Sequence, residues 1–254
     1  MRAAVEKIVK GNIETKYVVE NDGDGYNNLQ ISNNLVSVCP FTPVTAGVLQ
    51  PAIPPVTLGT LSADVVGSKI NSVRGAVHFE MELIPTVSGV DPTRNVVVVL
   101  YCLESKSAHS EASVKALPGL DLLRVGRSTA CDWTNVPLIN VLQLKNMPLG
   151  VGWRGFKKVF HFVKNQGVVQ GDNGSNQAPN TLPGGNRHAF TWRWNKDMIR
   201  YDEGGNNIGQ YPINYLPMWG AVAYFTDGTN TVPASEAGMG VNISWRTEMY
   251  YKDA

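Results

Sequence analysis

The stretch Ile70-Asn-Ser-Val-Arg-Gly-Ala-Val-His-Phe-Glu-Met-Glu-Leu-Ile84 decides the fold class of this chain. Its second half alternates between an apolar phase, Val77, Phe79, Met81 and Leu83, and a polar phase, His78, Glu80 and Glu82. A period of two residues is that of a β-strand with one buried face, because successive side chains point to opposite sides of the sheet. The sequence therefore predicts a long strand here, with its other face in water or in contact with a partner.

Similar strands are predicted on both sides of this one. Residues 96–103 are apolar throughout, which is typical of a central strand covered on both faces. In residues 188–195 the side chains of Phe190, Trp192 and Trp194 share one phase, which we expect to face the core. Further strands are predicted at residues 17–20, 29–39, 156–164, 218–225 and 241–249, with a bulge near residue 33 in the second of them.

Long loops join the predicted strands, and no helix of useful length lies between them. The chain has 25 Gly and 15 Pro residues, and residues 40–67 and 167–185 are especially rich in turn formers. This pattern excludes alternating strand and helix units and favours a sandwich or barrel. We predict an all-β fold, a single eight-stranded antiparallel jelly-roll sandwich with long loops. Residues 1–20 form a basic amino-terminal segment or arm, and residues 21–254 form the jelly-roll domain.

The composition indicates a protein that associates with copies of itself. Charged residues make up 17% of the chain, below the roughly 25% usual for soluble domains, and the net charge is +1. Surfaces poor in charge lose fewer hydrated ions when subunits meet. Near neutrality excludes a uniformly basic nucleic-acid-binding protein. No apolar stretch is long enough to cross a membrane and no signal peptide is apparent, so we expect cytosolic synthesis and no membrane insertion.

Signatures of common enzymes and metal sites are missing from the sequence. Neither GxSxG nor GxxxxGK[ST] occurs. The histidines and cysteines are widely spaced and form no ligand pair: His78, His109, His161, His188, Cys39, Cys102 and Cys131. We therefore expect no catalytic residue, no cofactor and no bound metal, and the protein is not expected to be an enzyme. A jelly-roll enzyme of the cupin type would need a histidine cluster.

Several short segments, in their order along the chain, carry a family resemblance. They are Ile13-Glu-Thr-Lys-Tyr17, Val66-Gly-Ser-Lys-Ile70, Asn95-Val-Val-Val-Val-Leu-Tyr101, Phe156-Lys-Lys-Val159, and a final apolar strand followed by an aromatic pair and Asp253. In this layout the chain resembles the capsid (coat) proteins of small circular single-stranded DNA viruses that encode a replication initiator, the CRESS-DNA viruses. In one departure from the family pattern, this sequence lacks the Arg/Lys-rich arm that usually precedes the lysine-bearing start.

The resemblance implies a jelly-roll of the viral capsid type that builds a small icosahedral shell around a single-stranded DNA genome. The expected partners are identical subunits, about 60 of them in the simplest closed shell, a single-stranded nucleic acid bound without regard to sequence, and a host surface receptor. The loops at residues 40–67 and 167–185 are expected to make the subunit contacts. The expected location is the virion, with the protein made in the host cytoplasm and assembled there or in the nucleus.

Nucleic-acid contact is expected from a few placed cations. The basic start of the chain offers Arg2, Lys7, Lys10 and Lys16, and the polar phases of two strands offer Arg193 and Arg246. The resemblance implies that the first, fourth, sixth and last strands form the sheet nearer the interior, where Arg193 and Arg246 would face the genome. By the same count, Lys157, Lys158 and Lys164 belong to the other sheet and point outward or towards other subunits.

Two other functions remain open at this point. One is a carbohydrate-binding β-sandwich module, because Trp133, Trp153, Trp192 and Trp194 would make stacking platforms if they were exposed. Core packing of the Trp192 and Trp194 pair is the preferred interpretation, since Phe190 shares their phase. The other is the coat protein of a small single-stranded RNA virus, which the sequence does not separate from a DNA virus.

Overall fold

The structure, a computed structural model, is built entirely from β-strands in the part of the chain that it describes. The described residues are 15–21, 27–30, 37–39, 49–59, 65–84, 95–107, 123–125, 129–131, 145–146, 148–162, 187–202, 210–226 and 240–253. The strands are β1 (Thr15–Asn21), β2 (Asn27–Gln30), β3 (Ser37–Cys39), β4 (Gln50–Pro51), β5 (Lys69–Ile84), β6 (Val96–Ser105), β7 (Leu123–Val125), β8 (Thr129–Cys131), β9 (Trp153–Phe162), β10 (Arg187–Arg200), β11 (Pro217–Phe225) and β12 (Gly240–Asp253). The predicted all-β class is confirmed.

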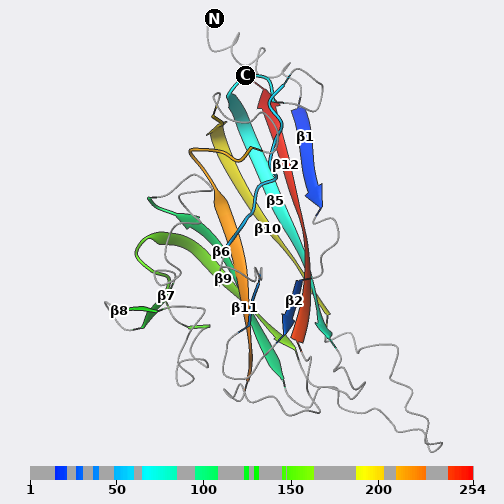
Figure 1. Cartoon of the computed structure of the whole chain (residues 1–254), viewed down its shortest axis with the longest axis vertical. Helices are drawn as coiled ribbons and strands as arrows, with labels where there is room; N and C mark the ends of the chain where they lie inside the picture. Colours follow the sequence, from blue (N-terminus) through cyan, green and yellow to red (C-terminus); the bar gives the residue numbers. More distant parts are fainter. Residues whose placement is uncertain are drawn as a thin grey trace, which may run out of the picture.

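Two antiparallel sheets contain most of these strands (Figure 1). The first sheet has the order β1-β12-β5-β10, and β2 also pairs with β12. The second has the order β3-β11-β6-β9, and β4 also pairs with β11. The strands β7 and β8 form a separate hairpin. Numbered along the chain, the eight strands of the two main paths therefore run 1-8-3-6 in one sheet and 2-7-4-5 in the other.

The long strand β5 is the centre of the first sheet, paired with β12 on one side and β10 on the other. Its apolar phase is buried as the alternation predicts, whereas Glu80 of the polar phase is exposed. Near its start the pairing with β12 shifts register between Tyr250 and Lys252, and Ser72 has a positive φ of 50°. This β-bulge changes the phase, so that Ile70 and Val73 both face inward.

The second sheet is apolar on both faces of its central strands. Every side chain of β6 except that of Glu104 is buried, and all nine residues of β11 are buried. Successive side chains point to opposite sides of a strand, so both faces of these two strands are covered. The prediction that residues 96–103 form a doubly covered central strand is confirmed. The outer face of the first sheet, in contrast, carries exposed polar side chains on its central strand β5, such as Arg74 and Glu80.

The core lies between the sheets and is rich in aromatic rings. Trp219 of β11 meets Phe79 of β5 edge-on with ring centroids 5.0 Å apart, and it meets Trp245 of β12 at 4.7 Å. On the inner side of β10, Trp194 donates a 2.9 Å hydrogen bond from Nε1 to the carbonyl of Ala52. Trp192 and Trp194 are each 8% exposed, so the preferred assignment of this pair to the core is confirmed.

Two expectations about the strands are corrected. The single strand expected at residues 29–39 is two short strands in different sheets, β2 and β3, because the chain crosses from one sheet to the other between them. The fourth predicted strand along the chain, β6, was expected in the inner sheet with the first, sixth and last strands. It lies in the second sheet, and β5 takes its place in the first sheet. In the segment 40–67, Ala52, Ile53 and Val56 pack in the core, and the subunit contacts expected of this segment stay a prediction for its other residues.

The close approach of Trp194 to Gly75 gives a stability prediction. These residues are cross-strand partners, and a Cβ added at Gly75 would overlap the six-membered ring of Trp194. Gly75→Ala should therefore lower the free energy of unfolding by about 1–3 kcal/mol, measured by urea denaturation. Gly152→Ala is the matched control, since a Cβ there meets no atom within 4 Å. Equal losses in both variants would contradict this packing.

Candidate nucleic-acid interface

The outer face of the first sheet is a regular grid of side chains from four strands. Pairing registers place Val19, Glu248, Ala76 and Arg193 in one cross-strand row and Tyr17, Tyr250, Arg74 and Asn195 in the next. Another row on the other side of the first contains Arg246, His78 and Thr191. Neighbouring strands lie about 5 Å apart, so the side chains of one row are within contact distance of one another.

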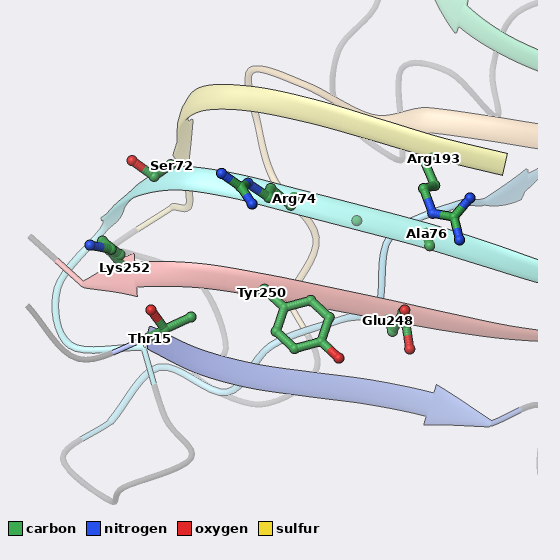
Figure 2. A pocket seen from close by; sticks show the side chains of 9 residues that line it. Thr15, Ser72, Arg74, Ala76, Arg193, Glu248, Tyr250 and Lys252 are labelled. Carbon is green, nitrogen blue, oxygen red and sulfur yellow. The ribbon is translucent and has the colours of Figure 1, made fainter.

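A hollow of about 580 Å³ opens on this face (Figure 2). It exists because Ala76 presents only a methyl group between the longer side chains of Glu248 and Arg193 in its row. Figure 2 shows the guanidinium of Arg193 reaching from β10 towards Ala76 of β5. The residues that line the hollow are Thr15, Ser72, Arg74, Gly75, Ala76, Arg193, Glu248, Tyr250 and Lys252.

Most of the charged groups that line the hollow are cations. Arg74, Arg193 and Lys252 contribute positive charge, and Glu248 is the one carboxylate among the lining residues. In the described part of the chain, no ion-pair partner lies beside the guanidinium of Arg74 or Arg193. Two unpaired guanidinium groups beside a hollow attract anions, and planar guanidinium groups bind phosphate well.

The carboxylate of Glu248 is occupied by its own neighbours. Its Oε1 lies 3.1 Å from Nε2 of His78, and its Oε2 lies 3.6 Å from Nη2 of Arg246 and accepts a 3.3 Å hydrogen bond from the Tyr17 hydroxyl. The Nδ1 of His78 lies 3.0 Å from Oγ1 of Thr191. This network joins β1, β12, β5 and β10, and it engages the carboxylate of Glu248, the one acidic group among the described residues that line the hollow.

Two tyrosines form an exposed aromatic platform beside the hollow. The rings of Tyr17 and Tyr250 have centroids 4.6 Å apart, and the side chains are 40% and 42% exposed. The hydroxyl of Tyr17 is fixed by a 2.6 Å hydrogen bond from Nη2 of Arg246, which also raises the pKa of Arg246. Loss of hydration, followed by the charge of Glu248, raises the pKa of Tyr250 above its ordinary value.

The cations predicted from the sequence lie in different environments in the structure. Arg193 lines the hollow, whereas Arg246 is on the same face but is engaged with Tyr17 and Glu248. Lys16 is half-buried and its partner in the β1 to β12 register is the buried Tyr251, so it lies in the opposite phase from Tyr17. The remaining predicted residues, Arg2, Lys7 and Lys10, lie outside the described residues.

Sequence reasoning missed Arg74, Lys252 and the two tyrosines. Arg74 continues the polar phase of the long strand, and Tyr250 and Lys252 continue that of the last strand, so the alternation was a usable signal. The missing information was the pairing of strands that are far apart in the sequence. Only that pairing brings Arg74 beside Tyr250.

A second, smaller cleft of about 320 Å³ lies between β9 and β10. On this side, Phe156 is 43% exposed and meets Trp192 edge-on, with ring centroids 6.2 Å apart. The indoles of Trp153, Trp192 and Trp194 are at most 8% exposed, so these three do not offer the open stacking faces that a sugar platform requires. Trp133 lies outside the described residues.

Among the described residues, no group of three or more histidine, cysteine or acidic side chains is placed to hold a metal ion. Within the same residues, no helix has the length and apolar character needed to span a membrane. As for similarity to known proteins, no family model matches this chain and no curated protein matches it.

The Glu248 network gives a second stability prediction. Glu248→Gln removes the charge that pairs with His78 and Arg246, and should lower Tm by roughly 2 °C in a calorimetric scan. Glu80→Gln is the matched control, because its partner Arg187 is 3.5 Å away and both side chains are more than 60% exposed. We expect less than about 1 °C of change there. Equal shifts would show that the network does not tie the four strands together.

Proposed function

We propose that this chain is a jelly-roll capsid protein that assembles with identical copies around single-stranded nucleic acid. The observation that carries the proposal is the strand order, 1-8-3-6 in one sheet and 2-7-4-5 in the other. In this order, chain neighbours alternate between facing sheets except for the hairpin of the fourth and fifth strands. This order supports a strip of four strand pairs rolled into two sheets, the jelly-roll that we propose and that many viral capsid domains have.

The composition of the chain supports self-assembly. Its low charged fraction reduces the cost of desolvating ions at subunit contacts. The core between the sheets is dense in aromatic and β-branched residues, which makes the sandwich a rigid block that can repeat without distortion. Shells are closed by repeated contacts between different surfaces of identical subunits, and long loops at the ends of a rigid sandwich suit such contacts.

The outer face of the first sheet is the proposed contact with nucleic acid. The unpaired guanidinium groups of Arg74 and Arg193 would neutralise phosphates, and this interaction is independent of sequence. We further propose that the face lines the interior of the shell, so that the protein's location is the virion, after synthesis in the host cytoplasm. The opposite surface would then be the one that meets a host receptor.

A carbohydrate-binding module is the weaker alternative, since three of its four candidate tryptophans are buried. The coat protein of an RNA virus is an alternative of a different kind. Phosphate and ring contacts occur with both DNA and RNA, and the exposed face offers no feature that separates them. We propose DNA as the enclosed nucleic acid because the sequence resembles the capsid proteins of single-stranded DNA viruses.

Microscopy of the purified protein tests the proposal. We expect negative-stain images and size-exclusion chromatography to show closed particles of uniform diameter in at least one condition across a grid of salt and pH. Particles that contain nucleic acid will also raise the ratio of absorbance at 260 nm to that at 280 nm, and nuclease sensitivity after disassembly will tell DNA from RNA. Monomers in every condition would contradict the proposal, and glycan binding by such a monomer would favour the alternative.

A further inference from the structure

We infer that the hollow on the first sheet is a subsite for one nucleotide of a single strand, with a phosphate between Arg74 and Arg193 and its base against Tyr250. This subsite deepens the proposed function and rests on it in one respect: the single strand of nucleic acid that it binds would be the packaged one. It differs from a general basic surface in a testable way, because it requires a base and a phosphate to be bound at adjacent positions.

The charges of the hollow favour a phosphate. Arg74 and Arg193 come from neighbouring strands and line the same hollow, and Lys252 adds a third cation to its lining. The two guanidinium groups lack carboxylate partners within the described part of the chain. The carboxylate of Glu248, in turn, faces the guanidinium of Arg246 at 3.6 Å and lies 3.1 Å from Nε2 of His78, so it is engaged by groups other than Arg74 and Arg193.

The aromatic ring beside those cations favours a base. Tyr250 is 42% exposed and lies next to Arg74 in the β12 to β5 register. Its ring is held in place by Tyr17, whose own hydroxyl is fixed by Arg246. A platform that is already ordered loses little conformational entropy when a base stacks on it.

The shape of the hollow favours a single strand over a duplex. The floor is Ala76, with the bulge at Ser72 at one end, so the cations and the ring surround a concave space and not a flat strip. Its volume of about 580 Å³ falls within the usual range for small-ligand sites. In a duplex the bases are stacked on one another and are not available to Tyr250, whereas a single strand can turn one base into the hollow.

Fluorescence anisotropy with a labelled oligothymidylate of about ten nucleotides tests the inference on the full chain. Ala76→Leu fills the hollow without changing any charge, and Tyr250→Leu removes the ring. Each should weaken binding by roughly 10-fold, with little change in the dependence on salt. Arg193→Gln should weaken binding and reduce the slope of log affinity against log salt by about 0.7, the effect of one lost phosphate contact to a single strand.

Matched controls separate a subsite from a general charge effect. Arg187→Gln removes the same charge from the same strand outside the hollow, and Phe156→Leu removes an exposed ring from the second sheet. Both should leave affinity within about twofold of the parent. Circular dichroism and the urea midpoint of each variant will establish that it is folded.

Several outcomes would overturn the inference. One is equal loss of affinity in Arg187→Gln and Arg193→Gln, and another is unchanged binding in folded Ala76→Leu and Tyr250→Leu. Binding of inorganic polyphosphate or duplex DNA as tightly as the oligothymidylate would also overturn it, since neither offers a free base. Particle formation is measured separately by microscopy. Shells that form while the subsite variants bind normally would refute the subsite alone, and an intact subsite on a protein that stays monomeric would refute the capsid alone.

Discussion

The antiparallel pairing of β5 with β12 is the interaction on which the rest of the structure depends. These strands lie far apart in the chain, yet their register runs from Gly240 opposite Ile84 to Asp253 opposite Ile70. A slip of one residue would move every inward side chain of a strand to the outer face, so the apolar phases of both strands hold the register. The same register sets Tyr250 beside Arg74 and Glu248 beside Ala76.

Two small residues of β5 leave room for larger groups on the two faces of the first sheet. Gly75 leaves room on the inner side for the indole of Trp194, which in turn holds the Ala52 carbonyl against the core. Ala76, the next residue, leaves room on the outer side for the hollow. Since successive residues face opposite sides, one Gly-Ala pair shapes both the packing of the core and the candidate site. In the second sheet the central strands β6 and β11 are covered on both faces, and exposed polar side chains lie on β9.

The sequence predicted the strands better than it predicted their partners. Alternation identified β5, β10 and β12, and the unbroken apolar run identified β6 as doubly covered. It did not reveal that β2 and β3 belong to different sheets, because short strands carry little periodic signal. Arg193 was recognised as a cation on an outer face, but its neighbours Arg74 and Tyr250 were not, because cross-strand pairing is a property of the fold and not of local sequence. The same limit led to β6 being placed in the wrong sheet.

The outer face of the first sheet connects the fold with the proposed function. A sandwich that assembles into a closed shell has one sheet nearer the enclosed volume, and a face with phosphate-binding cations and exposed rings suits that position. The most direct measurement is a cryo-electron microscopy reconstruction of the assembled protein at side-chain resolution. The account predicts a closed shell in which Arg74, Arg193 and Tyr250 line the interior. A shell with these residues on its exterior, or a protein that forms no shell, would contradict it.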